Sequence, residues 1–297
     1  MLTLDPAISH ENIDDLKSFP LNDTDVVIAG YPKSGTNWLQ VMLSNLWDDW
    51  TTLNNERRQV PHLAGKDRPG YGGYLACIGV GSPRLMKSHL PIDMMPDRWP
   101  DHGKVVNIVR NPKDVCVSYY HEARGRKPGA PGSHKLARPV DFPMREFVRE
   151  FAAGQVQYGS YIDHTIGWRT FDHPNLLKIT YEEARRDTRG TLERVVAFLG
   201  KPVPDDRLDE VVAKTEFSAM KKNELRFQMN VPDLREDRVG VGAFMRKGVV
   251  GDWKEEMSLA DSEYLDATVV AALEKAGVFL TYALDAPASL PAAPWNH

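Results

Sequence analysis

The segment Thr24–Trp50 reads TDVVIAGYPKSGTNWLQVMLSNLWDDW, and it predicts a strand, a glycine-containing loop and a helix in that order. The apolar run Val26–Ala29 is rich in β-branched side chains and bounded by turn residues, which is typical of a strand buried on both faces. After Thr36, apolar side chains recur every three or four residues as far as Trp50, which indicates an amphipathic helix. The loop Gly30–Gly35 therefore directs backbone amides and a helix N-terminus at one point, and both favour an anion.

The loop is similar to a P-loop but differs from it in the place of its lysine. Gly30 and Gly35 have the P-loop spacing, whereas Thr36 and Asn37 stand where that motif has Lys and Ser/Thr. The lysine lies inside the loop, at Lys33, where its ammonium can contact an oxygen between two anionic groups. The alternative is a solvent-facing lysine in an ordinary strand–helix turn. Two glycines, a proline and hydroxyl residues at one strand end favour the anion site.

Three further apolar runs predict the other strands, at 84–89, 104–109 and 176–181. Strands that alternate with helices favour a mostly parallel sheet with right-handed crossovers. The sequence therefore predicts a single α/β domain over residues 1–297, with a central sheet flanked by helices and a P-loop-like nucleotide-binding loop. His89 falls at the sheet edge where open α/β sheets bind ligands. Taken alone, a histidine there is more often a packed or surface residue than a catalyst.

Two basic groups outside the first loop have the chemistry of phosphate ligands. Arg110 directly follows the apolar run at 104–109, and Ser118 lies two turns into the next expected helix. Both side chains can therefore reach one phosphate. An ion pair between Arg110 and Asp114 is an equal alternative. Later in the chain, Arg246 and Lys247 precede a glycine, which suits phosphate capture by side chains and a backbone amide. Most such pairs are only solvated.

Several stretches lack periodicity and predict loops. Residues 1–23 should form a loop that leads to the first strand, with 1–20 loosely ordered. The segment 54–81 is either a functional lid or a poorly ordered linker. The basic, Gly/Pro-rich segment 125–142 indicates a mobile loop. The Pro/Ala-rich tail, 285–297, should be loosely ordered.

Composition narrows the classes of function. A net charge of −4 argues against a general nucleic-acid binder, so local basic residues must hold any anionic ligand. No apolar run is long enough for a spanning helix, and the N-terminus does not have the pattern of a secretory signal. Cys77 and Cys116 are the only cysteines, which is weak evidence for an oxidising compartment. We expect a cytoplasmic protein. No His/Cys cluster has zinc-ligand spacing, so no metal is expected.

Four motifs in series carry a family resemblance. They are YPKSGTNW at 31–38, KSHLP at 87–91, IVRNPKDVCVSYYH at 108–121 and RKGVVGDWK at 246–254. The chain resembles the cytosolic sulfotransferases, in order, over residues 21–273. These enzymes transfer a sulfuryl group from 3′-phosphoadenosine-5′-phosphosulfate (PAPS) to alcohols, phenols or amines. The fold that the resemblance implies is a single α/β domain around a parallel sheet, which agrees with the strand and helix pattern.

The resemblance implies a donor site. Lys33 would contact the bridging oxygen of the donor, and Trp38 would stack on the adenine. Arg110, Ser118 and residues 246–248 would bind the 3′-phosphate. The donor-binding residues that it implies are Lys33, Ser34, Gly35, Thr36, Asn37, Trp38, Arg110, Ser118, Tyr181, Thr215, Phe217, Met220, Arg246, Lys247 and Gly248.

The resemblance also implies a mechanism of in-line displacement that releases PAP (3′-phosphoadenosine-5′-phosphate). His89 would be the general base for the acceptor's hydroxyl or amine, and Lys87 would help to hold the transferring group. Lys33 and the loop amides would stabilise charge on the leaving phosphate, so no metal is required. A P-loop kinase is the first alternative, and the missing Lys-Ser/Thr pair argues against it. A non-catalytic PAP- or PAPS-binding protein is the second, and Lys33 with His89 argue against it.

At two places the sequence differs from the pattern of the family, and these differences concern the acceptor and the oligomeric state. The acceptor is expected to be a small molecule, with neither nucleic acid nor membrane as partner. Glu122–Gly125 replace the aromatic residues that wall the acceptor pocket in many relatives, which favours a larger or partly anionic acceptor. Lys254–Glu263 is similar to the dimer motif of the family, with Ser258 and Leu259 in place of Thr and Val, and it suggests a homodimer.

Overall fold

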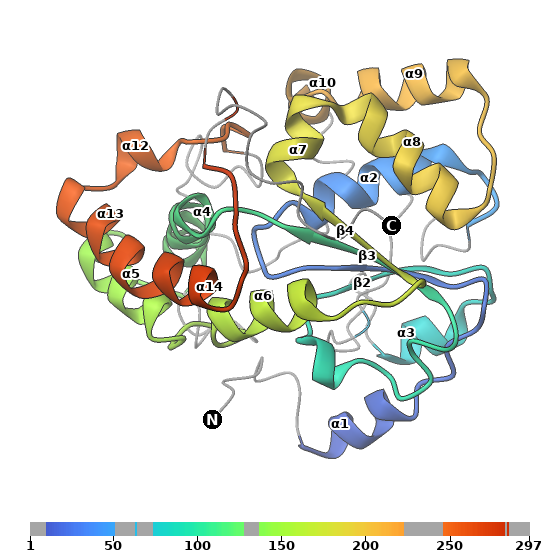
Figure 1. The fold of residues 1–297 in the computed structure, drawn as a ribbon, viewed down its shortest axis with the longest axis horizontal. Helices are drawn as coiled ribbons and strands as arrows, with labels where there is room; N and C mark the ends of the chain where they lie inside the picture. Colours follow the sequence, from blue (N-terminus) through green and yellow to red (C-terminus); the bar gives the residue numbers. More distant parts are fainter. Residues whose placement is uncertain are drawn as a thin grey trace.

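The computed structural model describes residues 10–50, 63, 74–127, 137–222, 246–282 and 284. Its centre is a parallel sheet of four strands in the order β2–β1–β3–β4 (Figure 1). The strands are β1 (Val26–Ala29), β2 (Leu85–Ser88), β3 (Lys104–Val109) and β4 (Leu176–Thr180). Because every strand runs in the same direction, the carboxyl ends meet at one edge of the sheet. The predicted α/β fold with a parallel sheet is confirmed.

Helices surround this sheet. In chain order they are α1 (His10–Lys17), α2 (Thr36–Leu46), α3 (Tyr74–Gly79), the short η1 (Ile92–Met94), α4 (Pro112–Gly125), α5 (Met144–Ala152), α6 (Tyr161–Thr170), α7 (Tyr181–Arg186), α8 (Thr188–Leu199), α9 (Asp205–Thr215), α10 (Phe217–Lys222), α12 (Trp253–Glu256), α13 (Leu259–Leu265), the π-helical η2 (Asp266–Val270) and α14 (Ala271–Lys275).

The strands are buried on both faces, which explains their continuous apolar runs. Val26 and Ile28 pack with α2, α8 and α9 in one hydrophobic cluster, and Val27 and Ala29 pack with α6 and the segment around η1 in another. Figure 1 shows α2 with α7–α10 on one side of the sheet and α1, α3 and α6 on the other. A third cluster joins α4, α5, α6 and α13, and of these α4, α5 and α13 stand beyond one end of the sheet in Figure 1. Val109, at the carboxyl end of β3, belongs to this third cluster.

A buried ion pair fixes the opposite ends of β1 and β2. The Asp25 carboxylate precedes β1 and is fully buried, and Arg84 Nε, just before β2, donates to both its oxygens at 3.1 Å. Arg84 also donates to the carbonyl oxygens of Pro20 at 2.7 Å and Cys77 at 3.1 Å. A buried ion pair needs such additional hydrogen bonds to offset the desolvation of its charges. The pair thus supports the register that sets Val26 opposite Leu85.

The structure differs from the sequence prediction at three helices. The predicted loop at 1–23 contains α1, and Leu16 and Phe19 are buried against the sheet. Helix α2 is buried on most sides rather than amphipathic, and it ends at Leu46, although Trp47 continues its apolar spacing. The helix expected after β4 is broken at Asp187, whose carboxylate accepts the amide of the third residue of α8 at 2.8 Å.

Some of the predicted loops lie outside the described residues. These are 1–9, 51–62, 64–73, 128–136 and 285–297, and they include most of the expected lid, the centre of the basic loop and the C-terminal tail. The two cysteines are both buried free thiols.

Candidate active site

The loop after β1 makes a tight turn at the N-terminus of α2. Lys33 and Gly35 have φ angles of 72° and 107°, in the left-handed region. A Cβ at Gly30 would lie 2.4 Å from the carbonyl oxygen of Ile108, so β1 leaves the sheet at a point where only glycine fits beside β3. A Cβ at Gly35 would lie 2.7 Å from the ring of Tyr181. The two glycines therefore allow the loop to press against β3 and α7.

Polar groups in this turn match an anion. Gly35 is the N-cap of α2 and provides no side-chain acceptor for the first amides of the helix, which have no acceptor inside the helix either. The Ser34 hydroxyl oxygen is buried and has no hydrogen-bond partner among the described residues. Unsatisfied donors beside the positive end of a helix dipole fit a phosphate or sulfonate group. The anion site predicted from the sequence agrees with this geometry.

Lys33 crosses from the loop to α4. Its Nζ lies 3.0 Å from Oε2 of Glu122, and only 14% and 18% of the two side chains are exposed. Burial alone would raise the pKa of Glu122, but Lys33 and Arg126 hold that pKa well below its usual range. Glu122 is therefore a carboxylate, and Lys33 is not the solvent-facing lysine of an ordinary turn.

Lys87, the penultimate residue of β2, provides a second ammonium whose pKa responds to the charges of Lys33 and Glu122. Its side chain is almost fully buried, and its Nζ donates to Oδ1 of Asn37 at 2.5 Å. Burial lowers the pKa of Lys87 to about 8, with the charge of Glu122 raising it and that of Lys33 lowering it. The structure thus brings Lys87 into contact with Asn37, at the start of α2, which lies 50 residues earlier in the sequence.

His89 follows β2 and is held in one tautomer. Its Nδ1 lies 2.6 Å from the carbonyl oxygen of Gly30, which can only accept, so Nδ1 carries the proton and Nε2 keeps its lone pair. The ring of Tyr158 packs edge-on against the imidazole at 5.3 Å. Burial, and then the charge of Lys87, lower the pKa of His89 to about 3. Neutral His89 with the proton on Nδ1 is thus the resting state.

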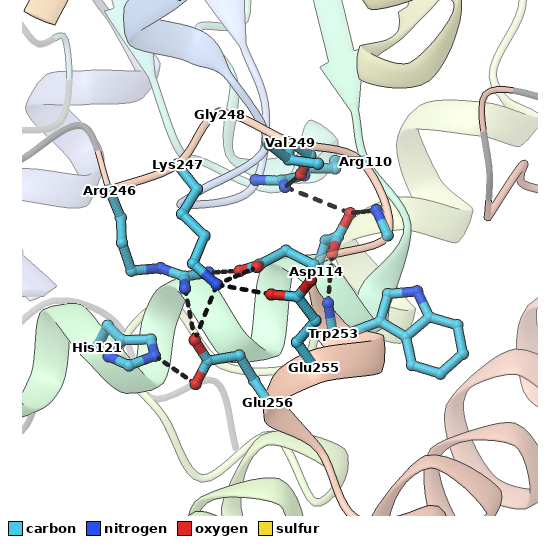
Figure 2. A network of polar contacts seen from close by, with 12 residues as sticks. Arg110, Asp114, His121, Arg246, Lys247, Gly248, Val249, Trp253, Glu255 and Glu256 are labelled. Carbon is cyan, nitrogen blue, oxygen red and sulfur yellow. Dashed lines mark hydrogen bonds and ion pairs between the residues drawn. The ribbon is translucent and has the colours of Figure 1, made fainter.

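A second group of cations lies on the segment 246–256. Arg246 Nη1 is 2.8 Å from Oε1 of Glu256, and its Nη2 pairs with Asp252. Lys247 Nζ is 2.8 Å from Oδ1 of Asp252 and 3.1 Å from Oε2 of Glu255. Figure 2 shows both basic side chains pointing from the loop toward the carboxylates of α12. The two cations are therefore held side by side, each paired with more than one carboxylate.

Arg110 joins this second group from the end of β3. Its Nη2 donates to the carbonyl oxygen of Val249 at 3.0 Å and lies 3.3 Å from Oδ2 of Asp114 (Figure 2). The guanidinium lies 4.5 Å from the centre of the Tyr181 ring. Of the two predicted arrangements, the structure contains the ion pair with Asp114. Ser118 is half-buried on α4, and Arg110 contacts Asp114 and Val249 rather than Ser118 in the described part of the chain.

An aromatic cluster adjoins both the loop that carries Lys33 and the second group of cations, because the Tyr181 ring lies close to Gly35 and to Arg110. Trp38 donates through Nε1 to the carbonyl oxygen of Thr215 at 2.9 Å, and its ring meets that of Tyr181 edge-on at 5.4 Å. The Tyr181 hydroxyl reaches the carbonyl oxygen of Gly248 at 3.3 Å, and a Cβ at Gly248 would lie 2.3 Å from the ring of Phe217. The predicted nucleotide residues that meet here are Trp38, Tyr181, Thr215, Phe217, Met220 and Gly248.

Sequence reasoning missed the acidic partners of these cations. Glu122 was noted only as a departure from an aromatic wall, because its contact with Lys33 joins α4 to a loop far away in the chain. The run of carboxylates at 252–256 does have a signal, since it follows Arg246 and Lys247 closely enough for local ion pairing. Tyr158, with a φ of 68°, carries no sequence signal for its place beside His89.

Comparisons with known proteins agree with this geometry. The family model described as sulfotransferase domain matches residues 23–277. The chain belongs to the sulfotransferase family. Sulfotransferase 1B1 of Mus musculus is 34% identical over 270 residues, which is 88% of this chain and 85% of that protein. Sulfotransferase 2B1 of Homo sapiens is 36% identical over 270 residues, which is 86% of this chain and 66% of that protein.

Solved structures share the fold of this sulfotransferase. The mouse sulfotransferase SULT7A1, crystallised in complex with PAP, matches with a TM-score of 0.72 and 28% identity over 92% of this chain and 91% of that one. Retinol dehydratase matches with a TM-score of 0.72 over 92% of this chain and 87% of that one, at 22% identity. The family resemblance predicted from the four motifs is confirmed, and this protein is an enzyme of the sulfotransferase class.

Two classes of feature are absent from the described residues. In that part of the chain, no helix has the length and apolar character needed to cross a membrane. Among the same residues, no group of three or more His, Cys, Asp or Glu side chains is arranged to hold a metal ion.

The pKa of His89 predicts a pH dependence of stability. Its pKa is about 3 in the folded protein and 6.5 when unperturbed, so below about pH 6.5 the unfolded chain binds a proton that the folded one does not. The free energy of unfolding should therefore fall as the pH is lowered, by about 2 kcal/mol for His89 between pH 7 and pH 5. Urea denaturation of wild type and His89→Asn at both pH values should show this part of the decrease only in wild type. Equal decreases would show that His89 titrates alike in both states.

Proposed function

We propose that this sulfotransferase moves the sulfuryl group of PAPS to the hydroxyl or amine of a small-molecule acceptor by in-line displacement, with release of PAP. The proposal rests mainly on one observation, the presence of two groups of cations that both adjoin one aromatic cluster. The first group contains Lys33 and Lys87, whose charges act on His89, and the second contains Arg110 with residues 246–247. Two groups of cations match a nucleotide with anionic groups on both its 5′ and 3′ positions. The PAP-bound relative SULT7A1 supports it.

The donor would be held by the loop, the aromatic cluster and the second group of cations. The amides of the α2 N-terminus and Ser34 would contact its 5′-phosphate, and the rings of Trp38 and Tyr181 would flank the adenine. Arg110 and Arg246 would bind the 3′-phosphate after leaving their present carboxylates. PAPS supplies the sulfuryl group and a phosphate leaving group. Preorganised donors at that leaving group lower the barrier most, since charge develops there in the transition state.

His89 is proposed as the general base. The Gly30 carbonyl fixes the proton on Nδ1, so Nε2 is the atom that would take a proton from the acceptor. Lys87 lies beside the same imidazole and lowers its pKa. An acceptor oxygen that loses its proton to Nε2 would face the group held by Lys33 and Lys87, which is the geometry of an in-line attack. Lys87 would keep the transferring group in place through its ammonium.

The wider proposal concerns the whole chain. We propose that residues 1–297 form one domain that acts in the cytoplasm, as the family resemblance implies. A homodimer through the segment Lys254–Glu263 is also proposed, because Leu259 at the start of α13 is 76% exposed. Light scattering should give the mass of two chains for wild type and of one chain for Leu259→Asp. A single-chain mass for wild type would contradict the dimer.

Donor selectivity should follow from the second group of cations. Calorimetric titration should show PAP bound at least about tenfold more tightly than ATP, since charge-assisted hydrogen bonds to the 3′-phosphate have no counterpart in ATP. Arg246→Ala should weaken PAP binding and leave ATP binding nearly unchanged. Equal affinities for PAP and ATP in wild type would favour a kinase and contradict the proposed donor.

Loss of the base should separate binding from turnover. His89→Asn should bind PAP as wild type does, while transfer of labelled sulfuryl from PAPS falls by about 10²–10⁴-fold, the usual contribution of a general base. The assay needs an acceptor found by screening phenols, sterols, aliphatic alcohols and sugars with labelled PAPS. Near-normal turnover of His89→Asn would exclude His89 as the base. Failure of wild type to transfer to any acceptor while it binds PAP would leave the non-catalytic alternative.

A further inference from the structure

Glu122 stands among the cations of the first group without a role in the proposed reaction. It lies on α4, ten residues after Pro112, and its carboxylate is 3.0 Å from Nζ of Lys33 through Oε2. Its other oxygen, Oε1, is 2.5 Å from Nη2 of Arg126, one turn further along the helix. The side chain is only 18% exposed. A carboxylate is thus held between the loop lysine and Arg126, the C-cap residue of α4.

The charge of Glu122 acts on the whole first group. It raises the pKa of Lys87 and of His89. Lys33 and Arg126 in turn keep Glu122 ionised. Any phosphate or sulfonate that enters beside Lys33 must therefore approach a fixed negative charge. In a site largely closed to water, that repulsion is screened only weakly.

We propose that Glu122 is a positioning residue that holds Lys33 in the ligand-free enzyme and competes with the donor and with PAP for that ammonium. The inference rests on the proposed function, because it takes PAP as the ligand of Lys33. A lysine suits such an exchange, since its ammonium is a compact charge on a flexible stem with three donors. Binding moves the ammonium from the carboxylate toward the 5′-phosphate, and Glu122 keeps Arg126. After transfer, the carboxylate recovers Lys33 and promotes the release of PAP.

The test is the affinity for PAP of the neutral isostere. Calorimetric titration of Glu122→Gln should show PAP bound about 5–20-fold more tightly than by wild type, because removing one member of a mostly buried ion pair frees Lys33 for the ligand. Stopped-flow measurements should assign most of this gain to a slower dissociation of PAP. Glu150→Gln is the matched control. Glu150 lies on α5, is 28% exposed and pairs with Arg138 at 2.8 Å. Neutralising its carboxylate should change the affinity for PAP by less than about twofold.

A double-mutant cycle shows whether the effect passes through Lys33. In the Lys33→Ala background, Glu122→Gln should alter PAP affinity by less than about twofold. A role of Glu122 that is only structural would change the melting temperature and leave the same factor in both backgrounds. The inference would be overturned if Glu122→Gln changed PAP affinity by the same factor in both backgrounds. It would also be overturned if Glu122→Gln did not tighten PAP binding in the otherwise wild-type enzyme.

Two further results distinguish a failure of the proposed function from a failure of the role assigned to Glu122. Wild type that fails to bind PAP would contradict the proposed function, whereas wild type that binds PAP while Glu122→Gln binds no more tightly would contradict only the role of Glu122. If Glu122→Gln does not fold, Arg126→Gln serves instead. Loss of Arg126 leaves the carboxylate to Lys33 alone, so this variant should bind PAP about 3–10-fold more weakly, and unchanged affinity would overturn the inference.

Discussion

The hydrogen bond from His89 Nδ1 to the carbonyl oxygen of Gly30 joins the residue that follows β2 to the loop that follows β1, and it depends on the pairing of β1 with β2. The register places Ala29 opposite Ser88, so the residues that follow the two strands lie side by side. The carbonyl oxygen of Gly30 is then 2.6 Å from the imidazole and fixes its tautomer. The buried pair at the opposite ends of the same strands supports that register. The orientation of His89 is therefore a property of the sheet rather than of its own turn.

Charge compensation is the second constraint on the site. Buried cations without partners would lower the stability of the fold, and each described cation of the two groups has an acceptor. The Asp114 carboxylate, which pairs with Arg110, also fixes the backbone of the site. It accepts hydrogen bonds from the amides of Gly251 at 2.9 Å and Trp253 at 3.1 Å, and so connects the segment after Arg246 to α4. The acidic partners hold the cations in place before a ligand arrives. They also reduce the net affinity for it, because binding must replace contacts that already exist.

Local signals allowed much of the fold to be predicted, and distant contacts could not be. The strand at Val26–Ala29 and the turn that follows need only their own residues, because apolar runs and glycines act over a few positions. The end of α2 at Leu46 was missed because Trp47 and Trp50 keep the apolar spacing, although they pack edge-on against each other at 5.7 Å beyond the helix. The contact of Lys33 with Glu122 joins elements 89 positions apart and is set by the packing of α4. Periodicity carries no information about such a pair.

The electrostatics of the first group relate ligand binding to base strength. Burial and the charge of Lys87 lower the pKa of His89 to about 3, so in the ligand-free enzyme the imidazole is a weak base near neutral pH. Under the proposed function, an anion between Lys33 and Lys87 offsets the charges that lower this pKa, and the pKa of His89 rises toward the range in which general bases work well. Glu122 already acts in that direction from the side of α4. The same Coulomb interactions that bind the donor would therefore complete the base, so that proton removal from the acceptor occurs efficiently only when the sulfuryl donor is in place.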